Sequence, residues 1–145
     1  MDTQRMRSRR RATPAHPTHT LATQLRLSGA PAPVAEYRLF AHHVGLGKGI
    51  KARFAAAGLR DFRYDLAYPA ERVCIDVQGG GFVNGHHSRG LGMEDDCEKH
   101  STAVALGWRV LTVTPRQVQD GRARQWVCRV LGVEPEGREL WRGIV

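Results

Sequence analysis

The chain has 145 residues, a length that favours a single domain. It carries 22 Lys and Arg against 14 Asp and Glu, a formal net charge of +8 at pH 7, and 41% of its residues are hydrophobic. It has no apolar run near the roughly 20 residues that span a bilayer, no apolar segment after its basic start, and no C-x-x-C pair among its three cysteines. These features argue against a membrane protein, a secreted disulfide scaffold and a thiolate zinc site, and we expect a soluble intracellular protein.

The positive charge is concentrated at the start of the chain. Residues 1–30 hold six Arg and a single acid, Asp2. Residues 1–19 are rich in Arg, Thr, Pro and His and have almost nothing to bury, so we expect a disordered basic tail before one domain at 20–145. Such charge suggests a polyanionic partner; the alternative is a tail without a function of its own.

The rest of the chain predicts alternating helices and strands. Leu21, Leu25 and Ser28 share a face of a first helix that Gly29 ends, and Thr114 followed by Pro115 is typical of a helix start. The predicted elements are a helix at 20–28, a linker at 30–33, a strand at 34–40, a helix at 46–58, strands at 62–68 and 73–78, a glycine-rich loop at 79–92, a helix at 93–106 with Met93, Cys97, His100 and Val104 along one stripe, a strand at 108–113, and a helix to Leu131 interrupted at Gly121. This order predicts an α/β sheet covered by helices.

The two strands at 62–68 and 73–78 predict a β-hairpin with one apolar side. The apolar faces consist of Phe62, Tyr64 and Leu66 on the first strand and Val73, Ile75 and Val77 on the second. If residues 69–72 form the loop, Asp65 lies directly opposite Asp76, where Cβ atoms are ~4.5–5.5 Å apart. Two carboxylates at that distance repel one another unless a positive charge lies between them.

A divalent cation is the simplest source of that charge. Mg²⁺ prefers one or two carboxylates together with waters and phosphate oxygens. Gln78 lies two residues beyond Asp76 on the same face, where its amide can orient a water. The alternative is a pair of solvent-facing aspartates on a polar sheet face.

These residues resemble the signature of the PD-(D/E)xK nuclease superfamily, an acid on one strand followed by acid-x-Lys or acid-x-Gln on its hairpin partner. The likeness is closer to small phage-type endonucleases that are similar to Holliday-junction resolvases and to very-short-patch-repair enzymes. The segments that carry it are E-Y-R-L-F at 36–40, R-Y-D-L-A-Y-P at 63–69, D-V-Q-G-G at 76–80, G-H-H-S-R-G-L-G at 85–92, D-C-E-K at 96–99 and G-W-R-V-L at 107–111. The resemblance implies a restriction-endonuclease-like mixed β-sheet flanked by helices.

The resemblance also implies a set of site residues. Asp65, Asp76 and Gln78 would be catalytic, and Mg²⁺ or Mn²⁺ would be held by Asp65, Asp76 and the carbonyl of Val77. Glu36 would either complete the metal shell or simply pair with a nearby Arg. The chain departs from the usual pattern in three places: Asp76 stands where Glu is more frequent, Gln78 stands where Lys is more frequent, and residues 42–60 look like an insertion.

DNA contacts are expected from the glycine-rich loop and from the helix after it. His87 and Arg89 carry donors for a phosphate backbone, and Lys99 can reach the region of the scissile phosphate. The alternatives are a flexible surface loop and an ordinary ion pair between Asp96 and Lys99.

The resemblance as a whole implies a Mg²⁺-dependent endodeoxyribonuclease in the cytoplasm of a bacterial or phage-infected cell. Its short chain favours selection of branched DNA, such as a junction, over a long specific sequence. A homodimer would place two active sites on opposite strands. The alternative is a non-catalytic DNA-binding module in which Asp76 and Gln78 mark a degenerate site.

Overall fold

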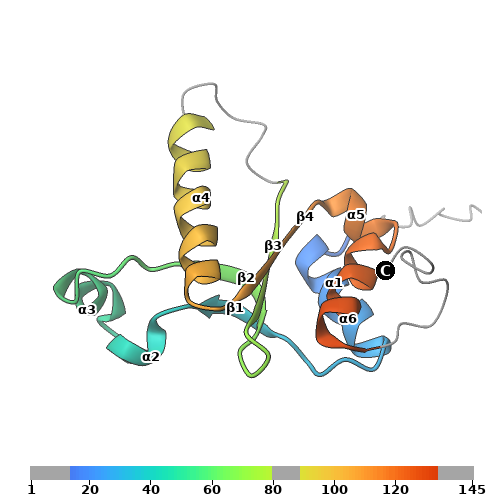
Figure 1. Ribbon diagram of the computed structural model, residues 1–145, viewed down its shortest axis with the longest axis horizontal. Helices are drawn as coiled ribbons and strands as arrows, with labels where there is room; N and C mark the ends of the chain where they lie inside the picture. Colours follow the sequence, from blue (N-terminus) through green and yellow to red (C-terminus); the bar gives the residue numbers. More distant parts are fainter. Residues whose placement is uncertain (1–13, 80–88, 134–145) are drawn as a thin grey trace, which may run out of the picture.

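The computed structural model describes residues 14–79 and 89–133 (Figure 1). Its elements in chain order are α1 (Pro17–Leu27), β1 (Val34–Arg38), α2 (Ala41–Val44), α3 (Ile50–Ala56), β2 (Arg63–Tyr68), β3 (Val73–Val77), α4 (Arg89–Ala105), β4 (Arg109–Val113), α5 (Pro115–Gln119) and α6 (Arg122–Leu131). None of these helices is long and apolar enough to cross a bilayer within the described part of the chain.

The four strands form one mixed sheet in the order β1-β2-β3-β4. The pairs β1–β2 and β2–β3 are antiparallel, and β3–β4 is parallel. The parallel pair requires a crossover, which α4 supplies. The prediction of an α/β protein with a mixed sheet flanked by helices is therefore confirmed.

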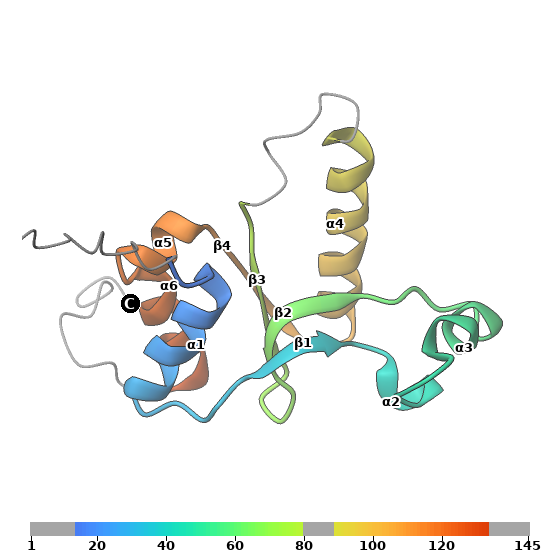
Figure 2. The same ribbon diagram turned by 180° about the vertical axis from the view of Figure 1, so that it is seen from behind.

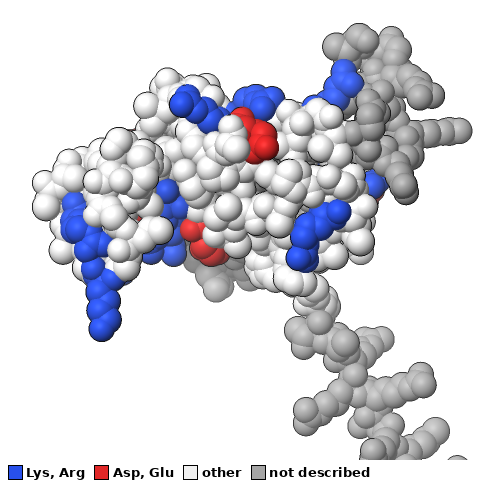
Figure 3. Space-filling view, turned by 90° about the horizontal axis from the view of Figure 1, so that it is seen from below, with Lys and Arg blue, Asp and Glu red and all other residues white. Residues whose placement is uncertain are grey.

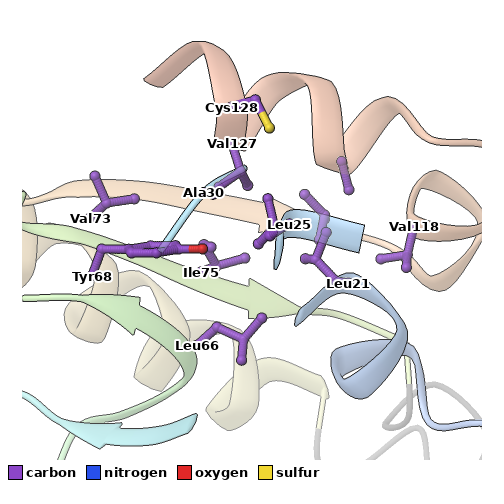
Figure 4. Close-up of a cluster of buried hydrophobic side chains, with 12 residues drawn as sticks. Leu21, Leu25, Ala30, Leu66, Tyr68, Val73, Ile75, Val118, Val127 and Cys128 are labelled. Carbon is purple, nitrogen blue, oxygen red and sulfur yellow. The ribbon is translucent and has the colours of Figure 1, made fainter. Parts of the chain in front are cut away.

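One face of the sheet is covered by α1, α5 and α6 (Figures 1 and 2). Leu21 and Leu25 of α1 and Val127 of α6 gather over Val73 and Ile75 of the sheet, and all five are fully buried (Figure 4). Burying an aliphatic side chain of this size contributes roughly 1.5–3 kcal/mol. This apolar layer is the main core of the protein.

The other face of the sheet is covered by α4 and is far less apolar. Ala103 is the one fully buried residue among the described side chains of α4. Met93 and Val104, from the stripe predicted for this helix, are 68% and 58% exposed. His100, from the same predicted stripe, does face the sheet and is partly buried, as is Lys99.

The hairpin has the predicted register. Tyr68 pairs with Val73 and Leu66 with Ile75, so Asp65 follows directly opposite Asp76.

The hairpin does not have the single apolar face that the sequence predicted. Tyr64 packs in the cluster beneath α4, whereas Leu66 packs in the cluster beneath α1 and α6. The alternation of side chains between the two faces of the sheet is interrupted near Glu36 of β1. Glu36 has a φ of +51° and lies next to the Tyr37–Tyr64 pair. The predicted polar face is also buried, since Asp76 is only 4% exposed.

Several predicted boundaries shift. Helix α1 begins at Pro17, so residues 17–19 of the predicted disordered tail are helical, and residues 1–13 of that tail lie outside the described residues. The His16 ring accepts a hydrogen bond from Thr18 N and caps the helix. The helix predicted at 46–58 is shorter, because glycines with positive φ at 45, 47 and 49 precede α3. The predicted strand at 34–40 ends at Arg38, and the short α2 was not expected.

The start of α5 is fixed by both predicted signals. Thr114 Oγ1 accepts from Gln117 N at 3.3 Å, and Thr114 N donates to Gln117 Oε1 at 2.9 Å. Pro115 also lies against Gly79, which follows β3 in the chain and has a φ of +152°. A Cβ atom at Gly79 would come within 2.7 Å of the Pro115 ring, so this close approach requires glycine.

We predict that Gly79→Ala lowers the free energy of unfolding by about 1–3 kcal/mol, because the added methyl group overpacks a rigid ring. Urea denaturation followed by circular dichroism measures the change. The matched control is Gly92→Ala in α4, where a Cβ atom meets nothing within 4 Å and the helix gains up to about 1 kcal/mol. Equal effects at the two glycines would contradict the packing of Gly79 on Pro115.

Candidate active site

The candidate site lies where the main-chain hydrogen bonds between β2 and β3 end and hydrogen bonds to side chains follow. Asp65 N donates to Asp76 Oδ1 at 3.2 Å, and Val77 N donates to Asp65 Oδ2 at 2.7 Å. Each carboxylate thus accepts a hydrogen bond from the main chain of the other strand. This exchange holds the two acids side by side, as the sequence predicted.

Helix α4 supplies the positive charge that the two carboxylates require. Lys99 Nζ lies 2.5 Å from Asp76 Oδ2, and His100 Nε2 lies 2.9 Å from the same oxygen. The side chain of Asp76 is 6% exposed and that of Lys99 is 17% exposed. Asp76 is therefore a nearly buried carboxylate whose main counter-charge is a lysine from another element.

Tyr64 holds this part of α4 in place. Its hydroxyl donates to the carbonyl oxygen of Lys99 at 2.7 Å, and its ring centroid lies 4.6 Å from Lys99 Nζ. The His100 ring stacks on Tyr64 with 6.3 Å between centroids. Burial raises the pKa of Tyr64 well above its ordinary value, so its hydroxyl remains a donor at neutral pH.

A pocket of about 310 Å³ opens beside Asp65, whereas Asp76 is buried behind it and does not line the pocket. Asp65, Lys99 and Glu36 contribute to its wall, together with other charged residues of both signs. Glu36 is largely exposed and lies 3.9 Å from Arg63, and this contact leaves open both of its predicted roles. Arg60, at the rim, binds both Asp95 and Glu98 of α4.

Burial raises the pKa of the Asp65 carboxyl above its ordinary value. The hydrogen bond from Val77 opposes this shift, the Asp76 carboxylate adds to it, and smaller effects come from Lys99 and Glu36. Asp65 is thus an acid whose charged form is destabilised by the fold.

The structure unites some of the predicted site residues and leaves others undefined. Asp65, Asp76 and Lys99 meet, although Lys99 pairs across to the sheet rather than acting as a plain surface charge. Val77 N donates to Asp65. Gln78, the next residue along the chain, donates its main-chain N–H to Val113 O at 2.7 Å. His87 lies outside the described residues, as does the side chain of Arg89, the first residue of α4.

Sequence reasoning did not assign Tyr64 or His100 to the site. The signal for His100 was its place beside Lys99 and one turn before the buried Ala103, on the side of α4 that faces the sheet. Tyr64 was assigned to the apolar face of the hairpin, and its hydroxyl gave no sign of a partner on α4.

The donor set fits a hard divalent cation only in part. Asp65 and Asp76 offer carboxylate oxygens at adjacent positions, which suits Mg²⁺ or Mn²⁺ with several waters. Asp76 Oδ2 already has two nitrogen partners, however, and the described residues contain no group of three His, Cys, Asp or Glu that could hold a metal ion. A bound cation would therefore compete with Lys99 for Asp76.

Charge is divided between the two sides of the sheet. Helices α1, α5 and α6 contain five Arg and no acid, whereas α4 contains Glu94, Asp95, Asp96 and Glu98. In the view from below, Lys and Arg side chains are spread over the surface with few acids among them (Figure 3). The basic character therefore lies mainly outside the candidate site.

Comparison of the chain with models of protein families, with curated proteins and with solved structures finds no match. The function therefore has to be inferred from the chemistry of the site.

We predict that Lys99→Met lowers the free energy of unfolding by about 3 kcal/mol or more, because it leaves Asp76 buried without its main counter-charge. Adding Asp76→Asn should recover much of the loss, giving a strongly non-additive double-mutant cycle in urea denaturation. The control is Arg122→Met, which removes an exposed pair with Asp120 and should change little. An additive cycle would contradict the buried ion pair.

We predict that Asp65→Asn stabilises the protein at neutral pH. An acid whose folded pKa lies above its unfolded value contributes its full stability only below the unfolded pKa, and this stability is lost as pH rises through the folded pKa. The advantage of the Asn variant should therefore grow as pH rises from about 4 toward 7. Thermal unfolding across this range measures it.

Asp120→Asn is the matched control for that pH series. Hydrogen bonds from Arg122 lower the pKa of Asp120. The stability of wild type should therefore increase relative to that of Asp120→Asn as pH rises. The same pH trend in both variants would contradict the proposed difference between the two carboxyls.

Proposed function

We propose that the protein is a metal-dependent DNA endonuclease with a restriction-endonuclease-like fold. The observation that carries the proposal is the meeting of Asp65, Asp76 and Lys99 at the end of the hairpin ladder, next to an open pocket. Two adjacent carboxylates can hold a divalent cation, and a nearby amine can donate to a phosphate oxygen. The resemblance of the surrounding motifs supports the same reading.

In this proposal Asp65, Asp76 and the carbonyl of Val77 hold Mg²⁺ or Mn²⁺, with Glu36 able to reach it through water. When bound, such an ion lowers the pKa of a water ligand and neutralises charge on the phosphate in the transition state. Gln78 orients the attacking water through its amide, without adding charge. Burial, the main cause of the raised pKa of Asp65, and the nearby Asp76 carboxylate both destabilise its charged form, which a bound cation would stabilise.

Lys99 supplies the positive charge that position 78 lacks. Its ammonium lies against Asp76 but on the wall of the open pocket, so it has a route from the carboxylate to a ligand in that pocket. In the proposed reaction Lys99 releases Asp76 and donates to a phosphate oxygen of the DNA. Tyr64 keeps the main chain of α4 in place while the amine turns.

The net charge of +8 supports a DNA partner, with an attraction that does not depend on base sequence. Branched DNA is the favoured substrate in this proposal, because the motifs resemble those of small endonucleases similar to Holliday-junction resolvases. Two-fold junctions suit a homodimer with one site for each strand. The cytoplasm of a bacterial or phage-infected cell is the proposed place of action.

A second function, a non-catalytic DNA-binding module, is favoured by one observation. Asp76 is 4% exposed and its Oδ2 is already shared by Lys99 and His100. In this alternative the ion pair is permanent and the acids serve only to join α4 to the sheet.

We predict metal-dependent cleavage of end-labelled DNA, measured on a four-way junction, a flap and a linear duplex in Mg²⁺, Mn²⁺ or EDTA. Asp65→Asn and Asp76→Asn should each reduce the rate by about 100-fold or more, since even partners that only orient metal ligands contribute about 10–100-fold. Asp120→Asn is the control for loss of a carboxylate and should retain activity.

Salt-sensitive binding without product in either metal would refute the nuclease and favour the binding module. Product that persists unchanged in Asp76→Asn would place the chemistry elsewhere.

A further inference from the structure

We propose that a second pocket, at the far end of α4, binds a single unpaired DNA base. The pocket has a volume of about 240 Å³ and lies between the β1–α2 connection and the start of β4. Its lining residues include Phe40, His42, His43, Arg72, Leu106 and Trp108.

Aromatic rings line this pocket, and each packs against a second aromatic ring of the protein. The Trp108 ring packs on Tyr37 with 5.4 Å between centroids, and the Phe40 ring packs on Phe62 at 6.4 Å. Both Trp108 and Phe40 are partly buried at the edge of the core beneath α4. The pocket therefore offers flat apolar faces that are already held in position, which suits stacking of a base.

Two exposed imidazoles extend the aromatic wall. The rings of His42 and His43 lie 4.1 Å apart, and His43 also contacts Phe40 with 6.2 Å between centroids. Histidine adds hydrogen-bonding nitrogens to a surface that can stack. Unpaired bases are recognised by this combination of stacking and edge hydrogen bonds.

The charge of the pocket favours a ligand that carries an anionic group such as a phosphate. No carboxylate is among its lining residues in the described part of the chain, and Arg72 provides a guanidinium at its wall. Arg72 Nη1 donates to the carbonyl of Leu106 at 3.4 Å, which leaves other donors of the fork for a phosphate. The pocket at the candidate active site is different, with carboxylates from both the sheet and α4.

The size of the pocket limits the ligand to one small ring system. Pockets for drug-sized ligands are roughly 300–1,000 Å³, and this one is smaller. A base in a paired and stacked duplex cannot enter it, so the base must be unpaired. The pocket thus distinguishes a distorted or branched DNA from a continuous duplex.

The position of the pocket links it to the candidate active site. Leu106 follows Lys99 by seven residues, which is about 10 Å along the axis of α4, or roughly three nucleotide steps of B-DNA. Trp108 and Tyr64 belong to the same cluster of side chains beneath that helix. If the protein is the proposed nuclease, on which this step depends, the pocket gives a physical basis for selecting branched DNA.

The test measures DNA binding by fluorescence anisotropy in EDTA, where cleavage does not contribute. The three probes are a duplex with one bulged adenine, the same duplex with an abasic residue at the bulge, and the fully paired duplex. The bulged and abasic probes carry the same phosphates, so their difference reports the base alone. Wild type should bind the bulged adenine about 5- to 100-fold more tightly than the abasic probe.

Variants of the wall should remove that preference while keeping general affinity. The combination of His42→Ala with His43→Ala changes exposed rings only, and Trp108→Leu keeps an apolar side chain but removes the flat face. His19→Ala, an exposed histidine of α1, is the matched control and should keep the preference. The combined histidine variant keeps the test decisive if Trp108→Leu fails to fold.

Equal wild-type affinity for the bulged and abasic probes would overturn the base pocket. A loss of affinity in the pocket variants that is the same for all three probes would also overturn it, since it would report phosphate attraction alone. A preference for the bulge in a protein that does not cleave in Mg²⁺ would support the pocket and refute only the nuclease.

Discussion

The carboxylate of Asp76 is the constraint on which this side of the structure depends. It is 4% exposed, and an ionised carboxylate so far from water is stable only when it is paired and hydrogen-bonded. Its partners are Asp65 N from β2 and the side chains of Lys99 and His100 from α4. This buried acid, together with Tyr64 and Ala103, therefore sets the position of α4 on the sheet. One pocket opens beside α4 and the other lies just beyond its end.

The two faces of the sheet differ in what holds them. Leu21, Leu25 and Val127 form a dry apolar layer on one face, whose stability does not depend on charge. On the other face α4 buries Ala103 and otherwise meets the sheet through the Asp76 pair and Tyr64. Elements with few buried apolar contacts open at lower free energy than the core. We therefore expect α4 to separate from the sheet before α1, α5 and α6 do.

Local signals predicted much of the fold, and long-range polar contacts were what they missed. The hairpin register, the helix start at Thr114 and Pro115, and the glycine end of α1 were correct because each depends on neighbours in sequence. The reversal of faces between Tyr64 and Leu66 was missed because Glu36 is an ordinary residue at a strained φ. The pair of Asp76 with Lys99 was missed because helical spacing relates Lys99 to Asp96 but gives no information about the sheet. The stripe predicted for α4 was right at His100, which contacts Asp76, but wrong at Met93 and Val104, which are exposed.

On the proposed function, Lys99 of α4 supplies a charge that a lysine on the strand would otherwise supply, and this difference has a consequence. At position 78 the charge would be fixed to the same strand as Asp76, whereas Lys99 belongs to an element that its own ion pair helps to hold. Releasing Asp76 to a cation therefore weakens the hold of α4 on the sheet, unless a phosphate takes over the Lys99 ammonium. On the proposed function, cation binding and DNA binding are for this reason favourable together and costly apart, which is a coupling between two ligands through one side chain. Tyr64 limits the cost, because its hydrogen bond to the Lys99 carbonyl persists whichever way the amine points.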